Sequence, residues 1–175
     1  MRNAAFLAFA LALILLQANM NRLLAPIGLH GWTPSMVLPL VVFLGVHEPS
    51  MARGAVLAFV IGHALDLFAS APIGLFTFVY VALWWLARVV GVRLAAQTVP
   101  TQMAFAFGFS LVQSLVILVL LAVFGADPQR PVELSYIVLP HSTATALFAP
   151  LVFRVAERLH QAAAAAAPRT QEVAR

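Results

Sequence analysis

The chain contains no cysteine and no lysine, and charged residues of any kind make up only 9% of it. Without cysteine, the protein cannot form disulfides, thiolate metal sites or a cysteine nucleophile. All of its positive side chains other than histidine are arginines, and they are scattered along the sequence rather than arranged in a stripe. This pattern favours anchoring against anionic lipid, and we expect no nucleic-acid partner.

What the chain has instead is apolar sequence, which makes up 63% of its residues and falls into long runs. A bilayer core about 30 Å thick needs roughly 20 apolar helical residues to cross it. The composition therefore predicts an all-α integral membrane protein with one domain, 1–155, followed by an Ala/Arg-rich tail, 156–175. We expect six transmembrane helices, at approximately 4–17, 34–46, 51–69, 72–90, 102–124 and 136–155.

The second predicted span is short and contains Pro39, which we expect to interrupt it. Backbone groups freed by a proline need partners inside the bundle, so this span should be surrounded by its neighbours. The first span follows Arg2 and has a cleavable signal peptide as its alternative interpretation, although no convincing small-x-small cleavage site ends it.

The arginines also predict an orientation, because positively charged loops tend to stay in the cytoplasm. With six spans and a cytoplasmic amino terminus, only Arg22 and Arg130 fall on the outer side. The cytoplasmic segments then hold all the other arginines: Arg2, Arg53, Arg88, Arg93, Arg154, Arg158, Arg169 and Arg175. We therefore expect a multi-pass protein with both termini in the cytoplasm.

The third predicted span carries small residues every four positions, at Gly54, Ala58 and Gly62, and the series ends at Asp66. This spacing places them on one side of a helix, where small side chains let a second helix approach closely. The turn after this span contains Pro72, which suits the first turn of the next helix, and Gly74, which permits close contact. The sequence predicts a tight helical hairpin.

Ionisable groups inside the hydrophobic part of a membrane are costly, and the third span holds two, His63 and Asp66. At 1.5 Å per residue, Asp66 lies about 6 Å and His63 about 10 Å from the outer end of the helix. His141 should reach a similar depth in the last span, and Gln17 or Asn19 lies on the same side. These residues are therefore candidates for a polar cluster.

Two interpretations of Asp66 remain open. It either clips the hairpin by bonding backbone donors around residues 70–74, or it contacts a ligand or partner directly. Ser110, Gln113 and Ser114 share one face of the fifth span, where interhelical hydrogen bonding is the expected role.

The hairpin residues resemble a pattern in the rod shape-determining protein MreD family: Arg53, Gly54, Gly62, Asp66, Pro72 and Gly74. The size of the chain, its six predicted spans, the Thr/Ala-rich stretch from Ser142 to Pro150 and the basic tail agree with that resemblance. His63 departs from the apolar residue expected beside Gly62.

The resemblance implies a component of the bacterial cytoplasmic membrane, with a fold similar to the substrate-binding subunits of energy-coupling vitamin transporters. Its implied partners are an MreC-like protein, the MreB cytoskeleton and the peptidoglycan synthases of cell elongation. Gly62, Asp66, Pro72 and Gly74 would be family positions, and none would be catalytic. No cofactor or metal is implied.

Two other function classes compete with this hypothesis. A vitamin-transporter subunit would use the polar groups near the outer surface as a binding pocket. An intramembrane enzyme is less favoured, because Gly108 to Leu111 lacks the second glycine of a nucleophile elbow and Asp66 has no second intramembrane carboxylate. Two histidines, His63 and His141, do not by themselves define a haem or metal site.

Overall fold

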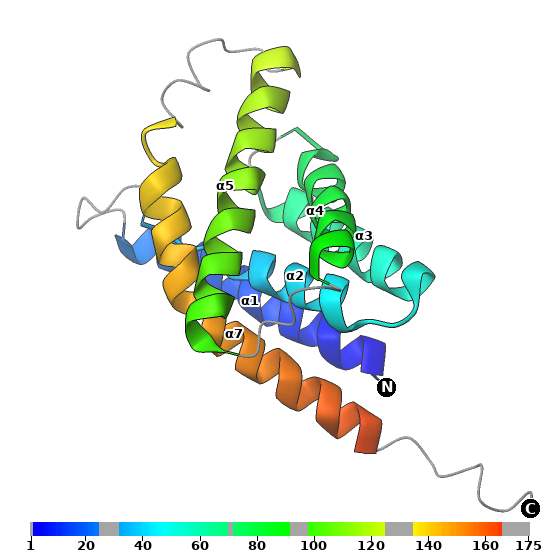
Figure 1. Ribbon diagram of the computed structural model, residues 1–175. Coiled ribbons are helices and arrows are strands. Elements are labelled where there is room, and N and C mark those ends of the chain that lie inside the picture. The colour runs from blue at the N-terminus through cyan, green and yellow to red at the C-terminus, as the bar shows by residue number, and fades with distance from the viewer. Residues whose placement is uncertain (1, 25–31, 70–71, 92–97, 125–134, 166–175) are drawn as a thin grey trace, which may run out of the picture.

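The computed structural model describes residues 2–24, 32–69, 72–91, 98–124 and 135–165 (Figure 1). These described segments are helical and contain no strand. The six helices are α1 (Arg2–Leu24), α2 (Val37–His47), α3 (Met51–Phe68), α4 (Leu75–Gly91), α5 (Val99–Phe124) and α7 (Val138–Ala165). Each of them overlaps one of the six predicted spans.

Four of the helices, α1, α3, α5 and α7, are long and apolar enough to cross a membrane. The other two, α2 and α4, are apolar but shorter. With 11 residues, α2 is about 16 Å long, roughly half the thickness of the hydrocarbon core. The described residues therefore form an α-helical membrane protein with four helices of spanning length, and the expected count of six spans is not confirmed.

Helix α2 forms the centre of the bundle. Its residues from Val37 to Gly45 are all buried, and it contacts α1, α3, α4, α5 and α7. This confirms that the second apolar segment is surrounded by protein. The expected interruption at Pro39 is wrong, because Pro39 lies in the first helical turn, where a backbone N–H has no intrahelical acceptor to lose.

The remaining helices pack around α2 largely as two pairs, α3 with α4 and α5 with α7 (Figure 1). The small-residue stripe of α3 faces α4. A Cβ added at Gly62 would lie 2.7 Å from the Thr77 Cα and 2.9 Å from the Phe76 carbonyl oxygen, and one added at Gly54 would lie 2.6 Å from the Trp84 Nε1. The predicted close approach of the two helices is confirmed at Gly62, where the neighbouring atoms are backbone, whereas the space at Gly54 is taken by the Trp84 ring of α4.

Two arginines meet the segment that joins α2 to α3. Arg88 of α4 donates to the carbonyl oxygens of Glu48 (2.6 Å) and Pro49 (3.0 Å), and Arg53 forms a 3.4 Å ion pair with Glu48. At this end, His47 also lines a crevice with Arg154 and Arg158 of α7. Arginines distant in sequence thus gather at one end of the bundle, which we call the Arg88 end.

These contacts predict unequal effects for the two arginines of the hairpin. Arg88→Met should lower the free energy of unfolding by about 1 to 2 kcal/mol, because two carbonyls after α2 lose a charged donor. Arg53→Met should cost less than about 1 kcal/mol, since the Arg53 side chain is 44% exposed. Unfolding of both variants in mixed detergent micelles measures the difference, and equal losses would contradict this account.

Candidate functional site

Asp66 lies at the opposite end of the hairpin, where α3 meets the start of α4, and it is only 3% exposed. Its Oδ1 accepts a hydrogen bond from the Phe76 backbone N–H (2.8 Å). Its Oδ2 accepts three bonds, from the backbone N–H groups of Gly74 (3.1 Å) and Thr77 (3.0 Å) and from the Thr77 hydroxyl (2.5 Å). Both oxygens of the carboxylate are therefore satisfied within the hairpin.

The reason for this arrangement lies in α4 itself. The first N–H groups of any helix lack intrahelical acceptors, and α4 has no acidic residue of its own in its first turn. Asp66 of α3 supplies the missing acceptor across the hairpin, and its negative charge also faces the positive end of the α4 dipole. These bonds match the clip interpretation: Gly74 is within the expected range of donors, and Phe76 and Thr77 extend the set beyond it.

The turn before α4 differs from the sequence expectation in two details. Gly74 has a φ of +97° and open space around its Cβ position, so it is needed for its backbone conformation and not for close contact. Pro72 precedes α4 rather than lying in its first turn, and its carbonyl accepts from the Leu75 N–H at 3.2 Å. Residues 70–71, which belong to the turn expected after the third span, lie outside the described residues.

The predicted polar cluster does not form. His63 is exposed on the outside of α3, where its ring stacks on Phe59 with centroids 6.2 Å apart. His141 bonds through Nδ1 to the Thr33 carbonyl oxygen at 2.6 Å, and Asn19 bonds to the Leu15 carbonyl of its own helix. Asp66 has its bonds with α4 instead, because the start of that helix offers nearer and better oriented donors than either histidine.

Two polar side chains have a role that the sequence did not reveal, which is to hold the residues that lead into α2. Gln17 Oε1 accepts from the Met36 N–H (3.1 Å), and Thr145 Oγ1 accepts from the Ser35 N–H (2.9 Å) while donating to the His141 carbonyl (2.8 Å). The central helix is thereby tied to α1 and α7. The weak advance signal was that both are polar residues within apolar spans.

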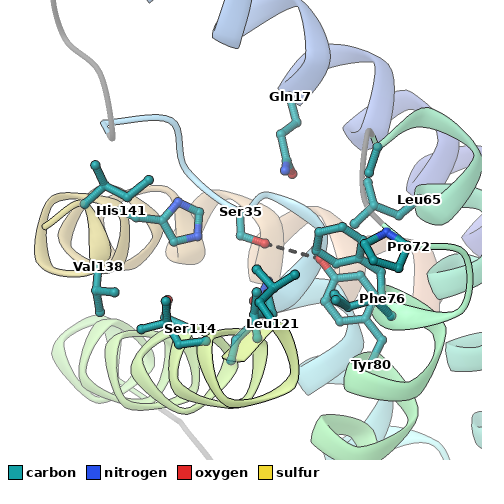
Figure 2. A pocket seen from close by; sticks show the side chains of 16 residues that line it. Gln17, Ser35, Leu65, Pro72, Phe76, Tyr80, Ser114, Leu121, Val138 and His141 are labelled. Carbon is teal, nitrogen blue, oxygen red and sulfur yellow. Dashed lines mark hydrogen bonds between the residues drawn. The ribbon is translucent and has the colours of Figure 1, made fainter. Parts of the chain in front are cut away.

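A cavity of about 330 Å³ opens at this end of the bundle, between the α3–α4 hairpin and the α5–α7 pair (Figure 2). Its walls are mostly aliphatic or aromatic, and Pro72 and Phe76 contribute to it. The polar side chains that line it are uncharged or imidazole: Gln17, Ser35, Tyr80, Gln113, Ser114 and His141. Ser35 Oγ and the Tyr80 hydroxyl are 3.4 Å apart across its wall.

The polar face of α5 shows one interhelical bond of the kind expected, between the Gln113 side chain and the Tyr80 hydroxyl of α4. Ser110 and Gln113 are both buried, yet Ser110 Oγ and Gln113 Oε1 have no hydrogen-bond partner in the described part of the chain. Ser114 lines the cavity beside Gln113, whereas Ser110 does not. The described residues contain no cluster of three or more histidine, aspartate or glutamate side chains that could hold a metal ion.

Comparison of the chain with protein-family models, curated proteins and solved structures finds no match.

Proposed function

We propose that this protein is a non-enzymatic membrane component of the bacterial cell-elongation machinery, in the manner of the MreD family. The observation that carries the proposal is the use of the motif residues. Gly54 and Gly62 admit α4, Gly74 permits the turn, and Asp66 caps α4, so the motif builds a rigid hairpin. A motif whose residues pack the helices and shape the turn suits a scaffold better than a catalyst.

In this proposal the chain lies in the cytoplasmic membrane, and the Arg88 end with both termini faces the cytoplasm. The rigid hairpin presents an outward face of α3 with exposed apolar side chains, among them Val56, Phe59 and Leu67. An MreC-like protein would dock through such helix faces and the outer loops. The complex would link lateral peptidoglycan synthesis outside to the MreB cytoskeleton inside.

The proposal predicts that depletion of the protein in its native cell makes rods lose their width control and round up. Ser110→Ala should restore rods, because Ser110 has no described bonding partner, whereas Asp66→Ala should fail and should recover less of an MreC-like partner in detergent. Microscopy and quantitative co-purification measure both effects. Rods of unchanged width and straightness after depletion would contradict the proposed function.

A second candidate is the substrate-binding membrane subunit of a small-molecule transporter, and the cavity at the Pro72 end is the observation that favours it. The two candidates differ in what the cavity is for, because a scaffold does not require a ligand in order to act. Loss of uptake of a nutrient in a deletion strain, with cell shape unchanged, would select the transporter.

A further inference from the structure

The cavity has features of a binding site that a scaffold does not need. Its volume of about 330 Å³ falls within the range of about 300 to 1,000 Å³ typical of small-molecule pockets. An apolar cavity of about 150 Å³ holds one benzene ring, so this one has room for roughly two fused rings. Five helices and the segment before α2 supply its walls.

A buried polar atom without a partner indicates where a ligand would bond. Gln113 is 4% exposed and lines the cavity. Its side chain bonds to the Tyr80 hydroxyl, and its Oε1 has no partner in the described part of the chain. Leaving such an acceptor unbonded in an apolar wall costs about 1 to 3 kcal/mol. A ligand donor, or an ordered water, would remove that cost.

The other polar atoms of the wall set the charge of the ligand. His141 lines the cavity and donates through Nδ1 to the Thr33 carbonyl, so the neutral ring offers Nε2 as a second acceptor. Figure 2 shows the His141 ring and the Ser35 side chain turned toward the same space. The described lining contains no carboxylate and no arginine, and the nearby Asp66 already accepts four bonds. An ionic ligand would therefore find no counter-ion.

We propose that this cavity binds an uncharged molecule of about two-ring size, with an apolar body and a hydroxyl or amide group that donates to Gln113 Oε1. The inference goes beyond the scaffold function and does not depend on it. The same chemistry describes a molecule dissolved in the membrane and one arriving from water. Both sources enter the test.

The test measures thermal unfolding of the full chain in nanodiscs with three probes. 1-Naphthol has two rings and a donor, 1-methoxynaphthalene has the same body without a donor, and nicotinamide is a water-soluble neutral amide. We expect 1-naphthol to raise the unfolding temperature in a saturable way and 1-methoxynaphthalene to bind at least fivefold more weakly, about the worth of one hydrogen bond. Stabilisation by nicotinamide would indicate that the ligand arrives from water. Stabilisation by 1-naphthol without stabilisation by nicotinamide would indicate that the ligand is dissolved in the membrane.

Variants of α5 connect the effect to the cavity. Gln113→Leu should remove the difference between 1-naphthol and its methyl ether, and Ser114→Phe should abolish saturable binding by filling the space. Ser110→Ala, one turn away and outside the cavity, should bind as the unaltered protein does. If neither 1-naphthol nor nicotinamide gave a saturable shift, or if the naphthol and its ether bound with equal affinity, the proposal would be overturned whatever the effect of depletion on cell shape.

Discussion

Replacing Asp66 with alanine is expected to lower the free energy of unfolding by about 3 to 5 kcal/mol. Four donors at the start of α4 lose their only described acceptor on α3. Phe76 is half-buried and Thr77 is buried, so water does not readily replace the carboxylate there. Hydrogen bonds to charged groups are worth about 1.5 to 3 kcal/mol each in soluble proteins. Bonds within membranes average less, and the four are not additive, so the expected loss is smaller than the sum of four such bonds.

The measurement is reversible unfolding in mixed micelles, followed by helical circular dichroism. His63→Ala is the matched control, because His63 lies three residues before Asp66 on the same helix, is exposed, and its described contact is a ring stack on Phe59. It should change the free energy by less than about 0.5 kcal/mol. Equal effects of the two substitutions would show that the carboxylate does not stabilise the hairpin.

The second large effect is expected from Gly62→Ala. The new methyl carbon would lie 2.7 Å from the Thr77 Cα and 2.9 Å from the Phe76 carbonyl oxygen, and both are backbone atoms that cannot rotate away. The two helices must separate, which should cost about 1 to 3 kcal/mol net of the gain in helix propensity. Thermal unfolding in detergent measures this loss. The displaced α4 should also weaken the Asp66 bonds, since they involve the same residues.

Gly108→Ala separates packing from propensity. Gly108 lies within α5, and a Cβ there meets nothing within 4 Å. The same chemical change should therefore leave stability unaltered or raise it by up to about 1 kcal/mol. If Gly62→Ala were equally harmless, the close approach of α3 and α4 would not limit stability.

Periodic features of the sequence predicted much of this fold. Long apolar runs located all six described helices, and the four-residue spacing from Gly54 to Asp66 predicted which face of α3 meets another helix. Such patterns are local, because the helical repeat alone decides which side chains share a face. Helix length was predicted less well, since α2 is too short to span a bilayer although its composition is that of a membrane segment.

The bonding partners of polar residues were not predictable in the same way. Gln17 and Thr145 hold the residues before α2 from positions 19 and 110 residues away from the groups that they bond, and no spacing rule relates them. The expected cluster of His63, Asp66 and His141 assumed that groups at one depth meet. Backbone donors at helix starts were the stronger competitors, and a sequence pattern does not display them.

His63 has a clear position but no structural explanation. Its ring lies against Phe59 on the exposed side of α3, and not against Asp66 as the predicted polar cluster requires. The intramembrane carboxylate, in contrast, is fully used in joining two helices. We therefore assign Asp66 a structural role in the hairpin, on which any partner would dock.

A double-mutant cycle between Asp66→Ala and Thr77→Val measures whether the Asp66 carboxylate stabilises the hairpin through its bonds to α4. The Thr77 hydroxyl donates to Asp66 Oδ2 at 2.5 Å, and valine keeps the shape of threonine without the donor. We expect Thr77→Val to lower the free energy of unfolding by about 1 kcal/mol or more in the otherwise unaltered protein, and by close to nothing in the Asp66→Ala background. Equal costs in both backgrounds, giving a coupling energy of zero, would contradict this role of Asp66.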